Sequence, residues 1–341
     1  MEMTFQLLEQ LSHKPRFLVG LGIVLWTCAY YYNKKVLSPF QYSVFAFKPI
    51  LFCTIVKREN NHISKKHSTK NMMSMTKRKI LDLKTAKELE VNAFIGETFG
   101  ELILPEGMIK IPGSMCEICR NLKKVVLPST LKRIEIGAFC GCSQLFDINI
   151  PDGIEDIGEN TFQGCKSLKQ ITIPSSLKRL SPEIFDSSGI ESIELPEGLE
   201  EIGYWAFYCC HRLKTLVIPK SVRHIERGIV TAHKCFEGLI CHADGYHVEN
   251  DALIDDEKQE LLCCWTQQKH YVVPMCVKKI ADISANTFVE SIIVKQPVEL
   301  TTNDTFVYNL NLREIQFLGG VSGLTKDTFY NCLKLRHKNH N

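Results

Sequence analysis

The sequence predicts a repeat solenoid of mostly short parallel β-strands, joined by turns and short 3-10 or helical segments. Three features recur at one period. Six prolines are separated by 23, 23, 23, 22 and 23 residues, an apolar pattern of the form L-x-x-I-x-I precedes them, and an aromatic residue with a small partner follows most of them. The prolines are Pro105, Pro128, Pro151, Pro174, Pro196 and Pro219. A period of this length is typical of stacked units that bury a shared core, because one unit alone has too little apolar surface.

Each copy of the apolar pattern predicts a short strand that ends at its proline. In one copy, Leu168, Ile171 and Ile173 precede Pro174. The last two apolar positions lie two residues apart, which is the period of a strand with one buried face. Proline lacks a backbone N–H and does not continue a β-ladder, so it ends the strand. A second apolar pair, three and six residues after the proline, predicts a short extended segment before the turn.

The turn of each unit holds an aromatic residue and, three positions later, a small one. The aromatic residues are Phe139, Phe162, Phe185 and Phe207, and the small residues are Cys119, Cys142, Cys165, Ser188 and Cys210. Because stacking places equivalent positions above one another, we expect these five small residues to form an interior ladder. The serine in the series indicates a requirement for size and not for redox chemistry, since a free cysteine behaves as a small buried apolar residue.

The single 22-residue step marks a deletion. Leu168 lies three residues after Cys165, whereas Ile190 lies two residues after Ser188, so one loop residue is missing. We expect the strand register to survive this loss, because a deletion within the strand would turn its buried side chains to the outer face.

Composition divides the chain into five parts. Residues 1–71 are a hydrophobic and basic N-terminal extension, 72–98 an N-terminal cap, 99–231 six regular repeats, 232–273 an irregular repeat or insertion, and 274–341 degenerate C-terminal repeats. The chain ends inside a unit, so its polar tail is interpreted either as a minimal cap or as the end of a fragment.

The N-terminal extension leaves localisation open between alternatives. The run Phe17–Tyr32 has sixteen residues without a charge, which is marginal for a membrane-spanning helix that needs about 20. It is interpreted as a signal anchor, as a secretory signal, or as a non-native extension before a start near Met72. Fifteen cysteines, an odd number, favour a reducing compartment such as the cytoplasm for the repeats, with a membrane-anchored or cell-surface location as the alternative.

Several phrases of the repeats carry a family resemblance. The stretches "IPDGIEDIGENTFQGCKSLKQITIP" and "LPEGLEEIGYWAFYCCHRLKTLVIP" resemble the BspA-type leucine-rich repeat family over residues 93–232, and more weakly up to residue 341. The stretch "YHVENDALIDDEKQELLCCW" resembles an irregular unit of the same family. The resemblance implies a curved, right-handed, horseshoe-like leucine-rich repeat coil with a strand-lined face that recognises proteins or other surface ligands. The family pattern contains no catalytic residues, so none are assigned and the chain is not expected to be an enzyme.

Candidate chemical sites are few. The net charge of +3 argues against a nucleic-acid partner, since such binding depends on many phosphate contacts. The most metal-like cluster contains Cys and His, which zinc prefers, at a spacing that matches no familiar finger. It consists of His233, Cys235, Cys241, His242 and His247. The repeat pattern assigns several of these residues to the core, so no metal and no cofactor are expected, and a zinc-binding protein is kept only as a remote alternative.

The outward positions of the predicted strands are the candidate binding site, although an ordinary solvated sheet face would look the same. They form two stripes of mixed small polar, apolar and few charged residues, as is usual where proteins meet. The stripes contain Lys124, Val126, Asp147, Asn149, Gln170, Thr172, Ser192, Glu194, Thr215 and Val217. The sequence therefore predicts a non-enzymatic scaffold with a protein partner of unknown identity. The alternative is a membrane-tethered cell-surface adhesion protein anchored by Phe17–Tyr32.

Overall fold

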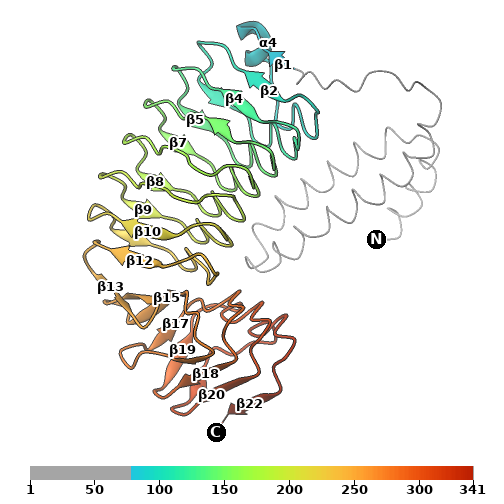
Figure 1. The fold of residues 1–341 in the computed structure, drawn as a ribbon. Helices are drawn as coiled ribbons and strands as arrows, with labels where there is room; N and C mark the ends of the chain where they lie inside the picture. Colours follow the sequence, from blue (N-terminus) through green and yellow to red (C-terminus); the bar gives the residue numbers. More distant parts are fainter. Residues whose placement is uncertain (1–77, 341) are drawn as a thin grey trace, which may run out of the picture. The chain divides into compact units, whose positions relative to one another are not determined.

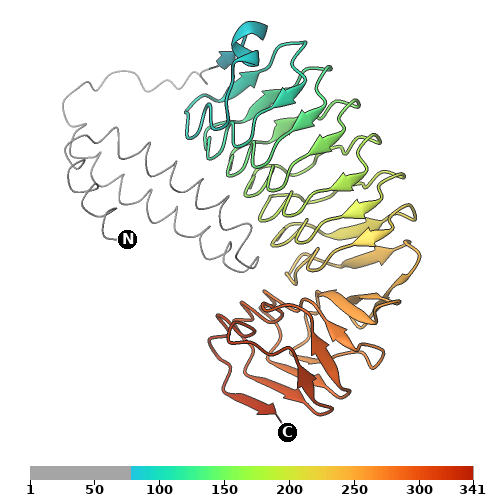
Figure 2. The same ribbon diagram turned by 180° about the vertical axis from the view of Figure 1, so that it is seen from behind.

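The computed structural model describes residues 78–340, which form a solenoid of parallel β-strands, so the predicted fold class is confirmed (Figure 1). The chain divides by its internal contacts into two compact units, Met1–Asn71 and Met72–Asn341, and the described residues all belong to the second. The predicted extension 1–71, with its candidate anchor Phe17–Tyr32, lies outside the described residues. Successive turns stack on one another through the described part of the chain, as the opposite view also shows (Figure 2).

The strands that precede the prolines, with their equivalents Arg78–Ile80 and Gly238–Cys241, form what we call the first sheet, which is divided into segments of four and two strands. Its strands are β1 (Arg78–Ile80), β2 (Glu101–Ile103), β4 (Lys124–Val126), β6 (Asp147–Ile148), β10 (Thr215–Ile218) and β12 (Gly238–Cys241). Neighbouring strands are parallel and pair residues one repeat apart, so Leu102 lies beside Val125 and Val125 beside Ile148. Alternation buries these apolar side chains and turns their neighbours outward.

The extended segments after the prolines form what we call the second sheet, which consists of two parallel segments of three strands each. The sequence predicted extended chain here without specifying strands. Its strands are β3 (Lys110–Ile111), β5 (Arg133–Ile134), β7 (Asp156–Ile157), β8 (Arg179–Leu180), β9 (Glu201–Ile202) and β11 (His224–Ile225). In each two-residue strand the second residue is buried and the first is exposed. The proline corner therefore separates two sheets that share one core.

The first turn of the described chain is closed by β1 and by a short helix, α4 (Leu83–Lys87). Asp82 caps this helix, since its Oδ1 accepts a hydrogen bond of 2.9 Å from the backbone N–H of Thr85. The ammonium of Lys79 lies 3.8 Å from the ring centre of Phe94, and Phe94 is buried. A strand, a capped helix and a covered aromatic ring thus end the core.

The interior holds two regular columns along the stack. Rings of Phe139, Phe162, Phe185 and Phe207 stack nearly parallel, with successive centroids 6.0, 5.7 and 5.6 Å apart. The five predicted ladder residues are all buried. Their thiols also donate hydrogen bonds to backbone carbonyls of the preceding turn. Examples are Cys142 to Cys116, Cys165 to Phe139 and Cys210 to Phe185, at 3.0, 3.3 and 3.0 Å. The four cysteines at this position thus combine a small volume with a hydrogen bond to the turn before, whereas the hydroxyl of Ser188 lies 3.4 Å from Cys210 Sγ.

The 22-residue step disturbs the first sheet more than expected. The two turns on either side of it, between β6 and β10, contain no strand before their prolines. Ile193 is only partly buried, whereas its equivalents Val125, Ile148 and Leu216 in the regular turns are buried. Gly189 fills the shortened loop, and a Cβ there would lie 2.1 Å from the carbonyl oxygen of Lys166. The deletion draws two loops into backbone contact, and the adjoining strands lose their regular hydrogen bonding.

The irregular region begins later than the sequence predicts. β12 pairs in register with β10, exactly one 23-residue period on, so the repeat persists through Cys241 and does not end at Ala232. An antiparallel insertion then follows. It consists of β13 (Tyr246–Glu249), β14 (Ala252–Asp255) and β15 (Glu260–Cys264).

This insertion separates two hydrophobic cores. In β14, Leu253 belongs to the core of the preceding turns, whereas Ala252 and Ile254 belong to the core of the following ones. In β15, Leu262 and Leu261 divide in the same way. Both faces of these strands are thus buried, which explains their nearly continuous apolar sequence.

The C-terminal turns resume the two-sheet pattern beyond the insertion. The strands that continue the first type are β16 (His270–Val272), β18 (Ser291–Val294), β20 (Glu314–Phe317) and β22 (His337–His340), and those of the second type are β17 (Lys279–Ile280), β19 (Val298–Leu300) and β21 (Val321–Ser322). β15 pairs with β17 in parallel, so the insertion joins directly onto these turns.

Candidate functional site

The ten predicted binding residues lie on the outer face of the first sheet. Lys124 and Val126 lie on β4, Asp147 on β6, and Thr215 and Val217 on β10. The other five lie in the same turns or in the two turns between β6 and β10. All ten are exposed or half-exposed. Lys124 and Asp147 pair across adjacent strands, with Nζ 2.7 Å from Oδ2, so part of the charge on this face is internally neutralised.

Apolar side chains on this face extend beyond the predicted set. Ile240 of β12 lies directly beside Val217 and is 51% exposed, while Val217 is 43% exposed. Phe146, directly before β6, is 58% exposed. Ile240 follows Val217 by 23 residues, so the repeat period places it on the same stripe. It was not among the predicted binding residues because the regular repeats were predicted to end at residue 231. Phe146 occupies a position that holds Lys or Glu in other turns. This aromatic residue at a usually charged position is the sequence feature that could have added Phe146 to the predicted binding residues.

The outer face of the second sheet has a different chemistry. Its strands and the residues beside them carry charges that pair from one turn to the next. Three of these ion pairs are Lys132–Glu155, Lys178–Glu200 and Arg179–Glu201, with nitrogen–oxygen distances of 3.2, 3.8 and 4.0 Å. Like other exposed pairs, each contributes little to stability. They leave a solvated, self-neutralised surface.

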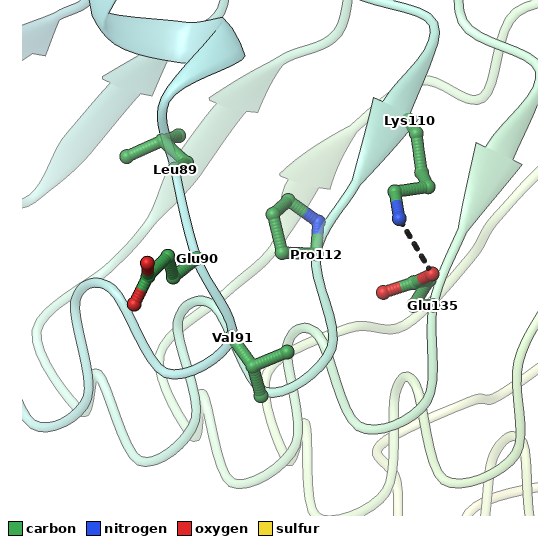
Figure 3. A pocket seen from close by; sticks show the side chains of 6 residues that line it. All are labelled: Leu89, Glu90, Val91, Lys110, Pro112 and Glu135. Atoms are coloured by element: carbon green, nitrogen blue, oxygen red, sulfur yellow. Dashed lines mark ion pairs between the residues drawn. The ribbon is translucent and has the colours of Figure 1, made fainter.

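A pocket opens at the N-terminal end of the second sheet (Figure 3). Its lining contains Leu89, Glu90, Val91, Lys110, Pro112 and Glu135. Lys110 Nζ lies 3.0 Å from one carboxylate oxygen of Glu135, and the other oxygen accepts a hydrogen bond from the backbone N–H of Gly113. Lys110 and Glu135 are therefore both engaged within the wall of the pocket, and the residues that line it offer no arrangement of a nucleophile and a base.

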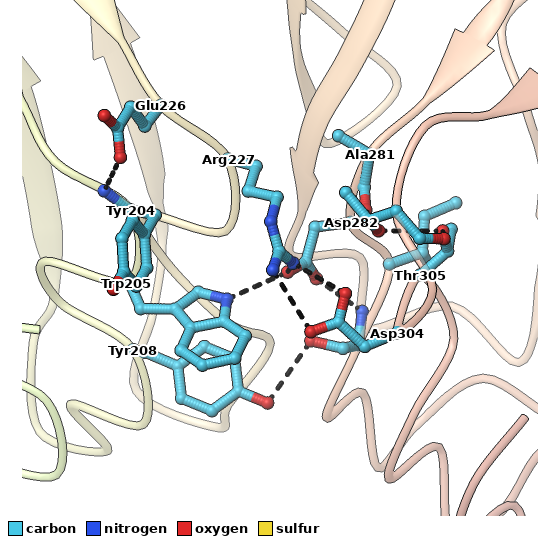
Figure 4. A network of polar contacts seen from close by, with 12 residues as sticks. Tyr204, Trp205, Tyr208, Glu226, Arg227, Ala281, Asp282, Asp304 and Thr305 are labelled. Carbon is cyan, nitrogen blue, oxygen red and sulfur yellow. Dashed lines mark hydrogen bonds and ion pairs between the residues drawn. The ribbon is translucent and has the colours of Figure 1, made fainter. Parts of the chain in front are cut away.

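A buried polar network connects the turns on either side of the insertion (Figure 4). The guanidinium of Arg227 lies 3.3 Å from an Asp282 oxygen and 3.0 Å from an Asp304 oxygen, and the two carboxylates are only 4% exposed. Trp205 donates its indole N–H to Asp282 at 3.0 Å, and its ring centre lies 5.0 Å from the Arg227 guanidinium carbon. Burial raises the pKa of Asp282, and the positive charge of Arg227 opposes that rise. This network joins the turns before the insertion to the turns after it.

A second polar cluster lies in the turns near the deletion. Glu183 accepts hydrogen bonds from the amides of Asn160 and Gln163, at 2.7 and 3.1 Å, and Gln163 also donates to Asp186. Burial raises the pKa of Glu183 to about 7 and that of Asp186 to about 6. These amide donors partly oppose the shifts by stabilising the ionised forms.

The predicted Cys and His cluster does not come together. His233 is buried and packs against the rings of His211 and Phe236, and burial lowers its pKa to about 4. Cys235 is exposed, and Cys241 lies in β12. His247 lies in β13, where its neighbours are not the other four residues but Asp256, Glu249 and Cys276. None of the thirteen cysteines in the described part of the chain forms a disulfide.

None of the helices within residues 78–340 has the length and apolar character needed to cross a membrane. Among curated protein sequences, none matched the chain.

Three bacterial structures are similar to the chain. A leucine rich cell surface protein from Faecalibacterium prausnitzii is 21% identical with a TM-score of 0.60, and the match covers 73% of this chain and 69% of that one. The pneumococcal vaccine antigen PcpA is 20% identical with a TM-score of 0.44, over 66% of this chain and 52% of PcpA. A leucine-rich repeat protein from Eubacterium ventriosum is 19% identical with a TM-score of 0.42, over 70% and 65% of the two chains. At this identity the first of these supports the fold alone.

The sequence profile of the BspA type leucine rich repeat region matches residues 109–236 and 266–339 in six copies, more than half of the chain. The turns that it matches are those of the two stacks, and the gap between the two ranges contains the antiparallel insertion. The chain therefore belongs to the BspA-type leucine-rich repeat family.

Proposed function

We propose that this chain is a non-enzymatic scaffold that holds a protein partner on the outer face of its first sheet. The observation that carries the proposal is the contrast between the two sheets. The second presents charges already paired between turns, whereas the first presents exposed Val217, Ile240 and Phe146 around small polar residues. Exposed apolar groups amid small polar ones favour association with another protein, because burying them releases water.

The centre of the face supports the same conclusion. Asn149, Thr172 and Glu194 occupy one stripe in three successive turns, and all three are exposed. Their side chains offer hydrogen-bond donors and acceptors one turn apart, which suits an extended or flat protein surface. The stacked turns beneath them restrict the movement of these groups, which lowers the entropy cost of binding.

A charge substitution on this face tests the proposal. The variant Asn149→Lys, Thr172→Lys and Glu194→Lys is compared with the control variant Asp156→Lys and Glu201→Lys, which adds the same net charge to the second sheet. Circular dichroism verifies that both fold. Immobilised wild-type and variant chains are then used to capture proteins from the source cells and their surroundings, with quantitative mass spectrometry as the readout.

Partners that bind the wild type and the control variant, and bind the first-sheet variant at least about tenfold more weakly, support the proposal. Equal capture by the two variants, or capture of nothing by the wild type, contradicts it.

A second proposal concerns location. The similar F. prausnitzii protein is described as a cell surface protein, and the run Phe17–Tyr32 is marginal as a membrane anchor. We propose surface display, with this run as the anchor, as the alternative role. Membrane fractionation with mapping of the mature N-terminus tests it, and a mature chain that begins near Met72 would rule it out.

A further inference from the structure

Three potential metal ligands converge at the edge of the antiparallel insertion. His247 and Glu249 lie two residues apart in β13, so they point to the same face of the strand. Cys276 comes from the turn after β16, which begins at Pro274. The Sγ atom of Cys276 lies 3.2 Å from Glu249 Oε2 and 4.0 Å from His247 Nε2. Nε2 and Oε2 are 3.7 Å apart, so three different donor atoms surround one point.

These separations are close to those of a tetrahedral zinc site. Zinc binds sulfur at about 2.3 Å, and nitrogen or oxygen at about 2.0–2.1 Å. Tetrahedral angles with those bond lengths place the ligand atoms about 3.3–3.6 Å from one another. The three distances here lie within roughly half an ångström of that range, so small side-chain rotations bring the atoms into coordination.

A fourth residue orients the histidine. Asp256, in the turn between β14 and β15, contacts Nδ1 of His247 through its Oδ1 atom. A carboxylate at Nδ1 holds the proton on that nitrogen and leaves the Nε2 lone pair free to bind a metal. This carboxylate–histidine pair is the usual outer partner of a metal-binding imidazole.

We propose that His247, Glu249 and Cys276 bind one divalent transition-metal ion of the zinc type, with Asp256 as the outer partner of His247. Cys276 releases its proton to solvent as the sulfur–metal bond forms, and Nε2 and the Glu249 carboxylate supply the other two bonds. His247, Glu249 and Asp256 are half-exposed, so the fourth position faces solvent and takes water or a donor from another molecule. The proposal is independent of the binding face on the first sheet.

The site would tie the insertion to the C-terminal turns. Cys276 packs against the core of those turns, whereas β13 is the outermost strand of the insertion. A metal ion bound only by the folded chain therefore raises its stability. Without metal, contacts of the His247 ring with two carboxylates, and a hydrogen bond from the Cys276 thiol to Glu249, would account for the same geometry. The experiment has to separate a metal from these protons.

Cobalt(II) provides the test, because thiolate coordination to cobalt gives a charge-transfer absorption in the near ultraviolet that protons do not mimic. The full chain, purified without metal under reducing conditions, is titrated with Co²⁺ and then with Zn²⁺. We expect the absorption to saturate at one equivalent of cobalt and to disappear when zinc displaces it. Cys276→Ser should abolish the absorption, whereas Cys235→Ser, which removes an exposed thiol elsewhere, should keep it.

Two further measurements complete the test. Asp256→Asn should keep the absorption but weaken metal affinity by about 10–100-fold, and zinc should raise the Tm of the wild type but not of Cys276→Ser. Absence of the absorption in the wild type, or its persistence in Cys276→Ser, overturns the site. An unchanged affinity in Asp256→Asn overturns the role given to Asp256.

Discussion

Replacing Arg227 by methionine should reveal how strongly the buried polar network holds the two stacks together. The substitution keeps most of the side-chain length but removes the cation. Arg227 is 15% exposed, and it faces two carboxylates that are each 4% exposed. In the variant, Asp282 and Asp304 would lie close together without a counter-charge.

The expected cost is about 3 kcal/mol at pH 8. Removing one partner from a buried ion pair costs about 3–5 kcal/mol. The lower end applies here, because Asp282 still accepts hydrogen bonds from Trp205 Nε1 and from the backbone N–H of Ser284, at 3.0 and 2.8 Å.

The cost should fall as the pH falls. Burial already raises the pKa of Asp282, and Arg227 opposes that rise, so the variant should raise this pKa further. A raised carboxyl pKa means that the folded state binds more protons than the unfolded state, and stability is then lost as the pH rises towards the folded pKa. We expect the variant's deficit at pH 5 to be at least about 1 kcal/mol smaller than at pH 8.

Urea denaturation followed by circular dichroism at both pH values measures these quantities. Arg133→Met is the matched control, because Arg133 is exposed on β5, and it should change stability by less than about 0.5 kcal/mol. A cost below about 1 kcal/mol for Arg227→Met at pH 8, or an equal cost at pH 5, would refute the reasoning from buried charge.

Three further predictions address the deletion, the ladder and the polar cluster. Gly189→Ala should lower the free energy of unfolding by about 1–3 kcal/mol, because its Cβ would overlap a backbone oxygen of the preceding turn. The control variant Gly153→Ala, whose Cβ would make ordinary contacts, should change the free energy of unfolding little. Equal effects of the two variants in urea denaturation would contradict this. Burial raises the pKa of the Cys165 thiol to about 12, so Cys165 should resist a thiol reagent under native conditions, whereas exposed Cys235 should react at once. Equal labelling of the two cysteines, measured by mass spectrometry, would disprove the buried ladder. Glu183→Gln should flatten the pH dependence of stability between pH 5 and 8, and the variant should be more stable than the wild type at pH 8. The reason is that a Glu183 pKa raised from 4.5 to about 7 makes the wild type lose stability as the pH rises through that window. Parallel stability–pH profiles of the two proteins would argue against this.

The repeat itself was predictable because its signals are local. Proline ends a strand wherever it stands, and alternation fixes which side chains face inward, so the buried Leu, Ile and Phe of the regular turns follow from the period. The thiol hydrogen bonds were not predictable, since nothing in a spacing reveals the direction of a carbonyl. The loss of regular strands at the deletion was not predictable for a related reason, because the close approach at Gly189 involves the backbone of a neighbouring turn.

The candidate sites also differ in whether local sequence signals predicted them. The outward stripes of the first sheet follow from alternation alone, whereas Ile240 was missed because the repeat was taken to end too early. Arg227 and its two aspartates are separated by 55 and 77 residues, and His247 and Cys276 by 29. The contacts of Arg227 span the insertion, and that of His247 joins its first strand to the turns after it. The sequence does not show how the insertion folds between the two stacks, so these contacts could not be predicted.

The insertion also sets how the protein can vary in length. Every other turn rests on neighbours of its own kind, so stability in such an array is a sum of nearest-neighbour terms. The strands β14 and β15 have one face in each core and therefore complete both arrays at once. Turns gained or lost towards either end leave the contacts of this shared wall unchanged, so the two arms can change length independently while the boundary between them stays fixed.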